Sequence, residues 1–172
     1  MLTGMGDPGI RIRSAQRVDA FAVAALTLQA ERELDAGATA RPGFLDQFAD
    51  AWLADRARVT WLAEDADGNP VGVIHAVLVT KLPSLRRPVT SWLHVSLLFV
   101  TQARRGEGIG SALLSTLLDW ASSHAVTRVQ LHATELGRSL YAAAGFEAPD
   151  ESFLVRHLAP PKEPSVRAEG AH

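Results

Sequence analysis

The sequence contains no cysteine. This absence excludes disulfide bonds, a thiolate-bound metal ion and an acyl-enzyme formed on cysteine. It also fits a reducing compartment, so we expect a cytoplasmic protein. No apolar run approaches the roughly 18 residues that a membrane span requires. The first nine residues lack a basic start followed by an apolar stretch, so neither a signal peptide nor a membrane partner is expected.

Charge of one sign is not in excess either. The 17 basic and 19 acidic residues give a formal net charge of −2 and a pI near 6.3. Neither value gives a reason to expect binding to nucleic acid or to a membrane surface. The six histidines show no tight ligand spacing. His94 and His132 could approach each other on adjacent strands, but two ligands do not make a site, so no metal is expected.

With 172 residues, 47% of them apolar, the chain predicts one mixed α/β (α+β) domain over residues 10–158. Residues 1–9 are expected to be flexible, and residues 159–172, rich in proline and charge, are expected to be a disordered tail. Alternation and helical periodicity give the order β-α-α-β-β-β-α-β-α-β. The expected strands are 10–13, 59–64, 70–81, 91–101, 126–133 and 153–158. The expected helices are one ending by Gly37 and those at 44–56, 108–124 and 135–144.

A glycine-rich segment, Arg105-Gly106-Glu107-Gly108-Ile109-Gly110, joins a buried strand to a helix. Glycines let the backbone approach a ligand closely, and the free N–H groups at a helix start attract an anion. Arg104 and Arg105 add positive charge, so this glycine turn (residues 105–110) predicts a phosphate or pyrophosphate ligand. The alternative is a tight connection with no ligand. The spacing fits neither the dinucleotide fingerprint nor a Walker A loop.

The spacing that fits is Arg-x-x-Gly-x-Gly after a strand that ends in valine. In this respect the sequence resembles the GNAT-type N-acetyltransferase superfamily, with Val100, Arg105, Gly108 and Gly110 at the matching positions. Glutamine follows the strand where the family often has proline.

A second segment strengthens the resemblance. Residues 131–134 (LHAT) and 137–146 (GRSLYAAAGF) look like the strand and the "LYxxxGF" helix of the same family. The resemblance covers nearly the whole chain apart from its ends. It implies a central, mostly antiparallel sheet of about six to seven strands, flanked by about four helices. It also implies acetyl-CoA as co-substrate, and dimers are common in the family, so a homodimer is an open possibility.

By the resemblance, the pantetheine arm of acetyl-CoA pairs with backbone near Phe99–Thr101, and its pyrophosphate lies on the glycine turn. Thr134 or Glu135 stands where the family often has asparagine. The residues that the resemblance assigns to acetyl-CoA are Phe99, Val100, Thr101, Arg104, Arg105, Gly106, Glu107, Gly108, Ile109, Gly110, Ser111, Thr134 and Tyr141.

Two side chains are candidates for proton transfer. Tyr141, the single tyrosine, matches the family position whose hydroxyl meets the coenzyme sulfur, so it is the expected general acid; the alternative is a core aromatic. His94 stands where some family members place a carboxylate base, and histidine suits amine deprotonation near neutral pH. It shares the strand parity of Val100, so a core histidine is the alternative. Glu64 and His75 are weaker candidates, and water chains could serve instead.

The leading hypothesis is an N-acetyltransferase that moves an acetyl group directly from acetyl-CoA to a primary amine. The acceptor, a small molecule or a peptide, cannot be identified from the sequence. The acidic stretch Glu31, Glu33, Asp35 lies where family members often build the acceptor site, although an exposed helix face explains it as well. The rival hypotheses are an acyl-CoA-binding module without turnover and a purely structural domain.

Overall fold

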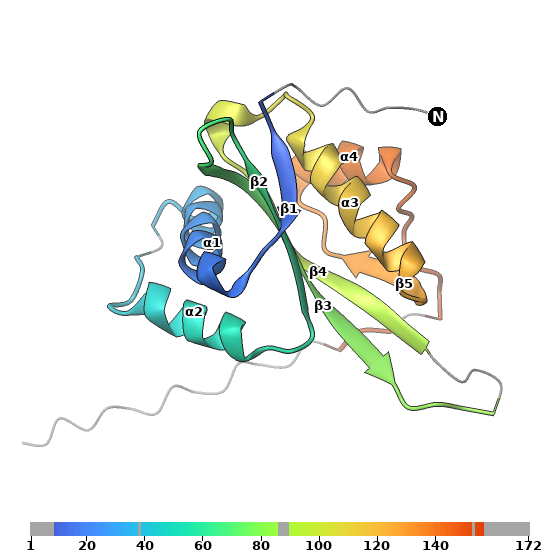
Figure 1. Cartoon of the computed structure of the whole chain (residues 1–172). Helices are drawn as coiled ribbons and strands as arrows, with labels where there is room; N and C mark the ends of the chain where they lie inside the picture. The colour runs from blue at the N-terminus through green and yellow to red at the C-terminus, as the bar shows by residue number, and fades with distance from the viewer. Residues whose placement is uncertain (1–8, 38, 86–89, 153, 157–172) are drawn as a thin grey trace, which may run out of the picture.

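The computed structural model describes residues 9–37, 39–85, 90–152 and 154–156. Within them the chain forms a five-stranded sheet of order β1-β2-β3-β4-β5, antiparallel except for the parallel pair of β4 and β5. Figure 1 shows α1 and α2 on one side of the sheet and α3 on the other. The strands are β1 (Arg11–Ser14), β2 (Arg58–Glu64), β3 (Pro70–Lys81), β4 (Thr90–Val100) and β5 (Val126–Leu131). The α-helices are α1 (Ala20–Leu34), α2 (Phe44–Ala54), α3 (Ile109–Ser123) and α4 (Arg138–Ala143).

This architecture confirms the expected mixed fold with a mostly antiparallel sheet. The described residues contain five strands rather than the expected six to seven. Of the strand expected at 153–158, residues 154–156 lie outside any strand, and Leu154 is 89% exposed, so no sheet face buries it. The remainder of that segment, the tail at 159–172 and residues 1–8 lie outside the described residues. No helix among the described residues is long and apolar enough to cross a membrane.

Two apolar cores hold the layers together. One lies between the sheet and α3 and centres on side chains with no exposed surface, including Ile74, Leu93, Leu113 and Leu117. The other lies between the sheet and the α1–α2 pair. A sheet buried on both faces explains why β3 and β4 read as continuous apolar runs rather than as alternating ones.

A β-bulge in the middle of β4 reverses which face its side chains meet. Val95 pairs with Ala76, and the next paired residue is Leu97, so Ser96 is the extra residue. Before the bulge Val95 faces α3; after it Leu98 and Val100 do. The side chain of His94 therefore faces the α1–α2 side, opposite to Val100. The expected shared face was wrong, because one inserted residue shifts a period-two pattern.

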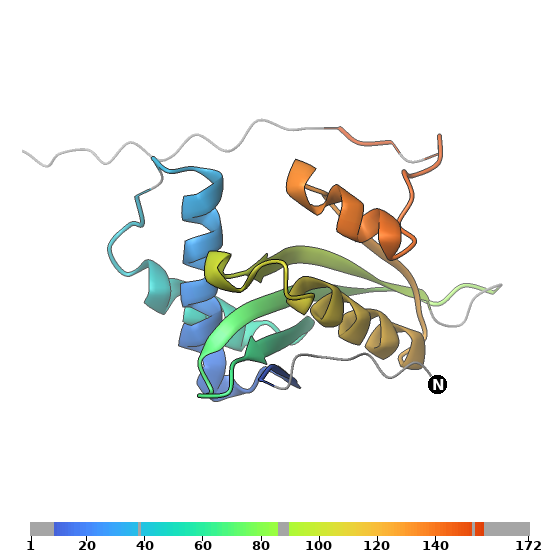
Figure 2. The ribbon, with the colours of Figure 1, turned by 90° about the horizontal axis from the view of Figure 1, so that it is seen from above.

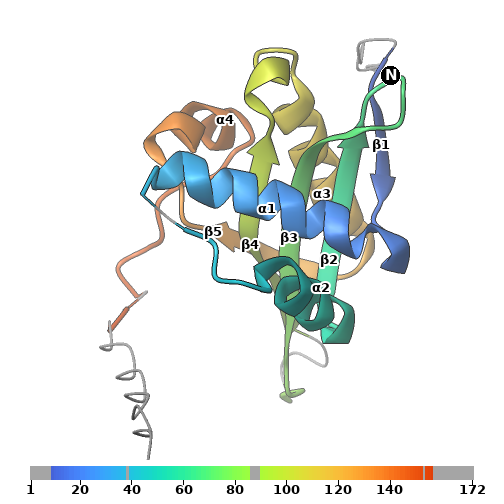
Figure 3. The same cartoon turned by 90° about the vertical axis from the view of Figure 1, so that its left-hand side faces the viewer.

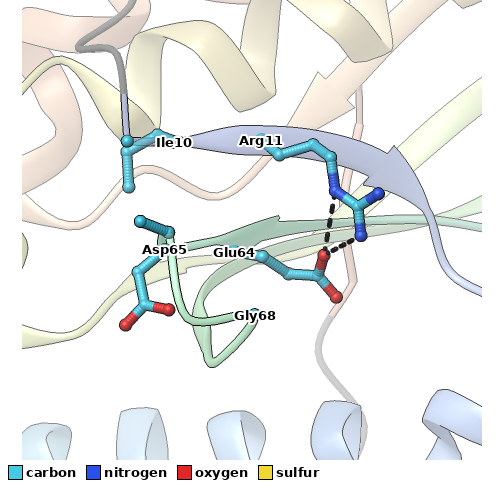
Figure 4. A pocket seen from close by; sticks show the side chains of 7 residues that line it. Ile10, Arg11, Glu64, Asp65 and Gly68 are labelled. Carbon is cyan, nitrogen blue, oxygen red and sulfur yellow. Dashed lines mark hydrogen bonds and ion pairs between the residues drawn. The ribbon is translucent and has the colours of Figure 1, made fainter.

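A buried carboxylate ties β1 to β2 and to the start of α1. Glu64, whose side chain is 6% exposed, accepts hydrogen bonds from Arg13 (Nε to Oε1, 2.8 Å) and Arg11 (Nη2 to Oε2, 2.6 Å; Figure 4). Arg13 also donates to Asp19 at 2.7 and 2.8 Å. The bonds from Arg13 and Arg11 lower the pKa of Glu64, and the bond from Arg13 lowers the pKa of Asp19. Both carboxylates are thus held ionised.

Glu64→Gln is expected to lower the free energy of unfolding by about 1–3 kcal/mol near neutral pH, because a buried charge-assisted network loses its acceptor charge. The pKa of Glu64 is lower in the folded than in the unfolded chain. Its contribution is therefore full above the ordinary value of 4.5 and is lost as pH falls through the folded pKa. Urea denaturation at neutral and acidic pH measures both effects.

Glu135→Gln is the matched control, because Glu135 pairs with Arg138 at 3.3 Å while its side chain is 93% exposed. Its effect should stay within about 0.5 kcal/mol. Equal losses in the two variants, or a Glu64→Gln loss that persists unchanged in acid, would contradict the assignment of stability to this network.

Candidate functional site

The glycine turn leads from β4 into α3 with its backbone N–H groups uncommitted to the helix. Gly106 and Gly108 have φ of 83° and 78°, a left-handed conformation that favours glycine, and Gly108 is the N-cap of α3. The first N–H to donate within α3 is that of Ala112, to Gly108 O at 3.0 Å. The N–H groups of residues 109–111 precede it and point out of the helix start, toward which the helix dipole attracts an anion.

Beside the turn, β4 and β5 diverge. Their pairing ends at Val95 and Leu131, whereas β3 pairs with β4 as far as Gly72 and Val100. Residues 96–100 of β4 therefore have β3 on one side and, among the described strands, no partner on the other. We call this opening the β4–β5 fork. Figure 2 shows β4 (yellow-green) running into the turn before α3. Helix α4 (orange) lies on the opposite side of β4 from β3.

The fork exposes the backbone of two particular residues. Thr101 N–H donates to Val71 O at 2.9 Å, so Thr101 faces β3. In an antiparallel pair every second residue faces the partner, so Phe99 also faces β3, while Leu98 and Val100 direct their N–H and C=O groups into the fork. Leu98 was absent from the sequence-based set. The phase of hydrogen bonding along the strand would have identified it, but a sequence does not reveal that phase.

Both arginines of the turn are engaged by carboxylates. Arg104 pairs with Glu107, with Nε to Oε2 at 2.8 Å. Arg105 forms an ion pair with Glu33 at the end of α1, donates from Nε to Val100 O at 3.0 Å, and lies 5.6 Å from the centroid of the Phe99 ring. The positive charge expected at the turn is present but balanced, so an entering phosphate would compete with these carboxylates.

Helix α4 lies against the start of α3. A Cβ built on Gly110 would be 3.2 Å from Leu140 Cδ1, so glycine at this position permits the close contact. A Cβ on Gly137 would be 2.9 Å from Tyr141 Cε2, which makes that glycine necessary for the position of the tyrosine ring. Thr134 precedes the helix, and its carbonyl accepts the N–H of Gly137 at 3.0 Å. Thr134 and Tyr141 are thereby brought to the end of the sheet that carries the glycine turn.

Tyr141 is half-buried against the core under α3, and its ring meets that of Phe146 edge to face at 5.7 Å. Burial raises the pKa of the Tyr141 hydroxyl above its ordinary value of 10.0. The hydroxyl therefore keeps its proton at neutral pH, as a proton donor must.

His94 lies where the fork opens, on the α1–α2 side of the sheet. It pairs in register with Gln130 of β5, and its ring centroid is 6.0 Å from that of His132. The expected approach of the two histidines is confirmed. Among the described residues, His94 Nδ1 is a buried polar atom with no hydrogen-bond partner. Such an atom costs free energy unless water or a ligand group meets it.

The two weaker base candidates are occupied elsewhere. Glu64 is held by Arg11 and Arg13 and keeps a lowered pKa, so it is a poor proton acceptor. His75 Nδ1 is 2.7 Å from Thr60 Oγ1, which in turn accepts from Trp52 Nε1 at 3.2 Å. Burial lowers the pKa of His75, so its ring is neutral at physiological pH. These contacts serve the α2 packing rather than the fork.

Other surface features do not coincide with the fork. One open cavity of about 360 Å³ lies beside Arg11 and the β2–β3 hairpin (Figure 4). Another of about 440 Å³ lies near Trp52 and Trp120. Within the described part of the chain, no group of three or more histidine, aspartate or glutamate side chains is placed to hold a metal ion.

Comparison with known sequences gives one family. The profile of the acetyltransferase (GNAT) family matches residues 26–146. N-acetyltransferase 8 of Rattus norvegicus is 35% identical over 107 residues, which cover 60% of this chain and 46% of the relative. Its Homo sapiens counterpart is 31% identical over 107 residues, covering 60% and 45%. The chain thus spans about half the length of the curated relatives that it matches.

Solved structures agree in fold. A GCN5-related N-acetyltransferase from Ralstonia eutropha JMP134 has a TM-score of 0.70 and 26% identity, covering 88% of this chain and all (100%) of that one. A ribosomal-protein-alanine N-acetyltransferase from Brucella melitensis biovar Abortus 2308 has a TM-score of 0.67 and 28% identity, covering 86% and 99%. An acetyltransferase from Clostridium acetobutylicum, solved with acetyl-CoA, has a TM-score of 0.68 and 19% identity, covering 86% and 96%, and shows the fold alone.

Proposed function

The chain belongs to the acetyltransferase (GNAT) family, and from that premise we propose that it transfers an acetyl group from acetyl-CoA directly to a primary amine. One observation carries the proposal. The outward-facing backbone groups of Leu98 and Val100 lead along the fork into the N–H groups at the start of α3. A single extended molecule with amides at one end and a pyrophosphate at the other, such as acetyl-CoA, matches that sequence of donors and acceptors.

The proposed binding residues divide by chemistry. Backbone N–H groups of residues 109–111 bind the pyrophosphate, and Gly106 and Gly108 allow its close approach. Arg104 and Arg105 contribute charge once they exchange their carboxylate partners for phosphate. Thr134, at the entry to α4, is proposed to contact the pantetheine arm from the opposite side of the fork.

The transfer forms a C–N bond and breaks a C–S bond. The acceptor nitrogen must be unprotonated to attack the thioester carbonyl, and we assign the removal of its proton to His94, directly or through water. The departing sulfur takes a proton from the Tyr141 hydroxyl. Solvent then carries the proton from His94 back to Tyr141, so the protons balance over one cycle. A fork N–H, that of Leu98 or Val100, polarises the carbonyl as negative charge develops on its oxygen.

Acetyl-CoA turnover, measured as free-thiol release against a panel of small and peptide amines, tests the proposal. Thiol release that depends on one of the amines supports an enzyme. Coenzyme binding without amine-dependent release would favour the binding module, and no coenzyme binding at all would leave the purely structural domain.

His94→Gln is expected to lower kcat by about 100-fold near neutral pH, because general-base catalysis contributes on the order of 10²–10⁴. His124→Gln is the matched control, since His124 stacks on Trp120 at 4.0 Å at the opposite end of α3 from the glycine turn. A His94→Gln enzyme with an unchanged rate would leave water as the base.

A further inference from the structure

An ion pair between Arg105 and Glu33 links the glycine turn to α1. Arg105 and Glu33 are 72 positions apart in the sequence, and their side chains are 42% and 40% exposed. Arg105 also donates to Val100 O, one of the backbone groups that face the fork. A single guanidinium thus binds a carboxylate of α1 and a carbonyl of the proposed donor site at the same time.

Acetyl-CoA would compete for both of these contacts. Its pyrophosphate offers Arg105 a doubly charged partner, which attracts a guanidinium more strongly than one half-exposed carboxylate does. An amide N–H of the pantetheine arm would replace Arg105 Nε at Val100 O. A donor that takes both contacts would displace Arg105 from its present position and release Glu33.

The release of Glu33 matters because of where the end of α1 lies on the sheet. Figure 3 shows α1 crossing the sheet so that its C-terminal end lies toward β4 and α4. Phe99, which packs against the α1–α2 layer, faces the same side of the sheet as His94. Glu33 therefore belongs to the layer that covers the side from which His94 approaches the fork. An uncompensated carboxylate there attracts a cation.

Building on the proposed function, we infer that Arg105 and Glu33 exchange partners when the donor binds: Arg105 moves to the pyrophosphate, and Glu33 becomes the carboxylate that recognises a cationic acceptor amine. Before donor binding, Arg105 neutralises Glu33 and the acceptor site is weak. After donor binding, the acceptor arrives as an ammonium ion at Glu33 and gives one proton to His94, which releases it to solvent. The second proton, lost from the nitrogen as the amide forms, returns through His94 and solvent to Tyr141, which has protonated the sulfur. The acceptor class is thus an amine that is positively charged in solution.

The test uses the full chain and the variants Glu33→Gln and Glu31→Gln. Glu31 lies on the same helix and provides a control of equal charge change. Calorimetric titration with coenzyme A should show about 2- to 5-fold tighter binding by Glu33→Gln than by the wild type, because Arg105 no longer has a competing partner. Glu31→Gln should bind as the wild type does.

Steady-state kinetics test the acceptor half of the inference. For alkyl amines acetylated by the wild type, Glu33→Gln should raise KM by about 5- to 10-fold with kcat little changed, whereas KM for aniline, which is neutral near pH 7, should not move. The inference would be overturned if coenzyme A affinity were equal in all three proteins, or if Glu33→Gln changed KM equally for charged and neutral amines. If the wild type binds coenzyme A but acetylates no amine, the acceptor part of the inference fails together with the proposed function. The coenzyme A affinities of the variants then still test the exchange of partners by Arg105. If the wild type does not bind coenzyme A, both fall.

Discussion

Replacing Tyr141 with phenylalanine is expected to lower kcat by about 100-fold or more, because the departing thiolate loses its proton donor. The ring contact with Phe146 and the packing beside Gly137 do not involve the hydroxyl, so the fold should survive the change. Thiol release under saturating acetyl-CoA and amine measures the loss, and a thermal melt checks the fold.

The pH dependence gives this prediction a second readout. Because burial raises the pKa of Tyr141 above 10.0, the wild-type rate should hold into the alkaline range and fall only when that hydroxyl loses its proton. The alkaline fall should be missing from Tyr141→Phe. Full activity in Tyr141→Phe would show that solvent protonates the sulfur and would remove Tyr141 from the mechanism.

Gly108→Ala is expected to weaken coenzyme A binding by about 10- to 100-fold. A Cβ at this position meets nothing within 4 Å in the protein. Gly108 is the N-cap of α3, so we expect the added methyl group to obstruct the close approach of the pyrophosphate to the helix start. The residue also has φ of 78°, which an alanine adopts only with strain of about 1–2 kcal/mol. Steric exclusion acts on the ligand and backbone strain acts on the fold, so the two effects must be separated.

Gly68→Ala separates them. Gly68 lies in the β2–β3 hairpin with φ of 83°, and a Cβ there also meets nothing within 4 Å. The two variants should lose similar amounts of unfolding free energy in urea, while only Gly108→Ala loses affinity in calorimetry. Equal affinity in both variants would mean that the glycine turn is a tight connection and not a ligand site.

The local structure of the glycine turn is the feature that sequence reasoning predicted best. A helix start and its glycines depend on neighbours a few residues apart, so residues 105–110 carry most of the information that shapes them. The order of strands and helices up to α4 followed from periodicity in the same way. The prediction of a strand around residue 154 was wrong for residues 154–156. Pairing into a sheet depends on partners that are distant in the sequence, and an apolar segment alone does not specify them.

The face of His94 could not be predicted. A single extra residue, Ser96, lies in an apolar run in which no glycine or proline marks a bulge. Strict alternation therefore placed His94 with Val100, and the bulge placed it on the opposite face. Leu98 was missed for a different reason: the phase of hydrogen bonding, set by the bond from Thr101 to Val71, decides which backbone groups of β4 face the fork, and a sequence does not reveal that phase.

The ion pair between Arg105 and Glu33 could not be predicted from the sequence either. Sequence patterns predicted a phosphate-binding role for Arg105, and for Glu33 either a place in the acceptor site or an exposed helix face, each from its own neighbourhood. Only the fold brings them into contact. Because Arg105 already has a carboxylate partner, a phosphate must replace Glu33 to bind it. This exchange of partners is the basis for the inferred link between the donor and acceptor sites.

The central claim is that the glycine turn binds the pyrophosphate of an acyl-coenzyme A. Calorimetric titration of the wild-type protein with coenzyme A and with pantetheine, which has the same arm but no pyrophosphate, tests it most directly. The account predicts saturable binding of coenzyme A and binding of pantetheine weaker by about 100-fold, since the anion contacts at the start of α3 supply most of the affinity. Equal affinity for the two compounds, or binding of neither, would contradict it.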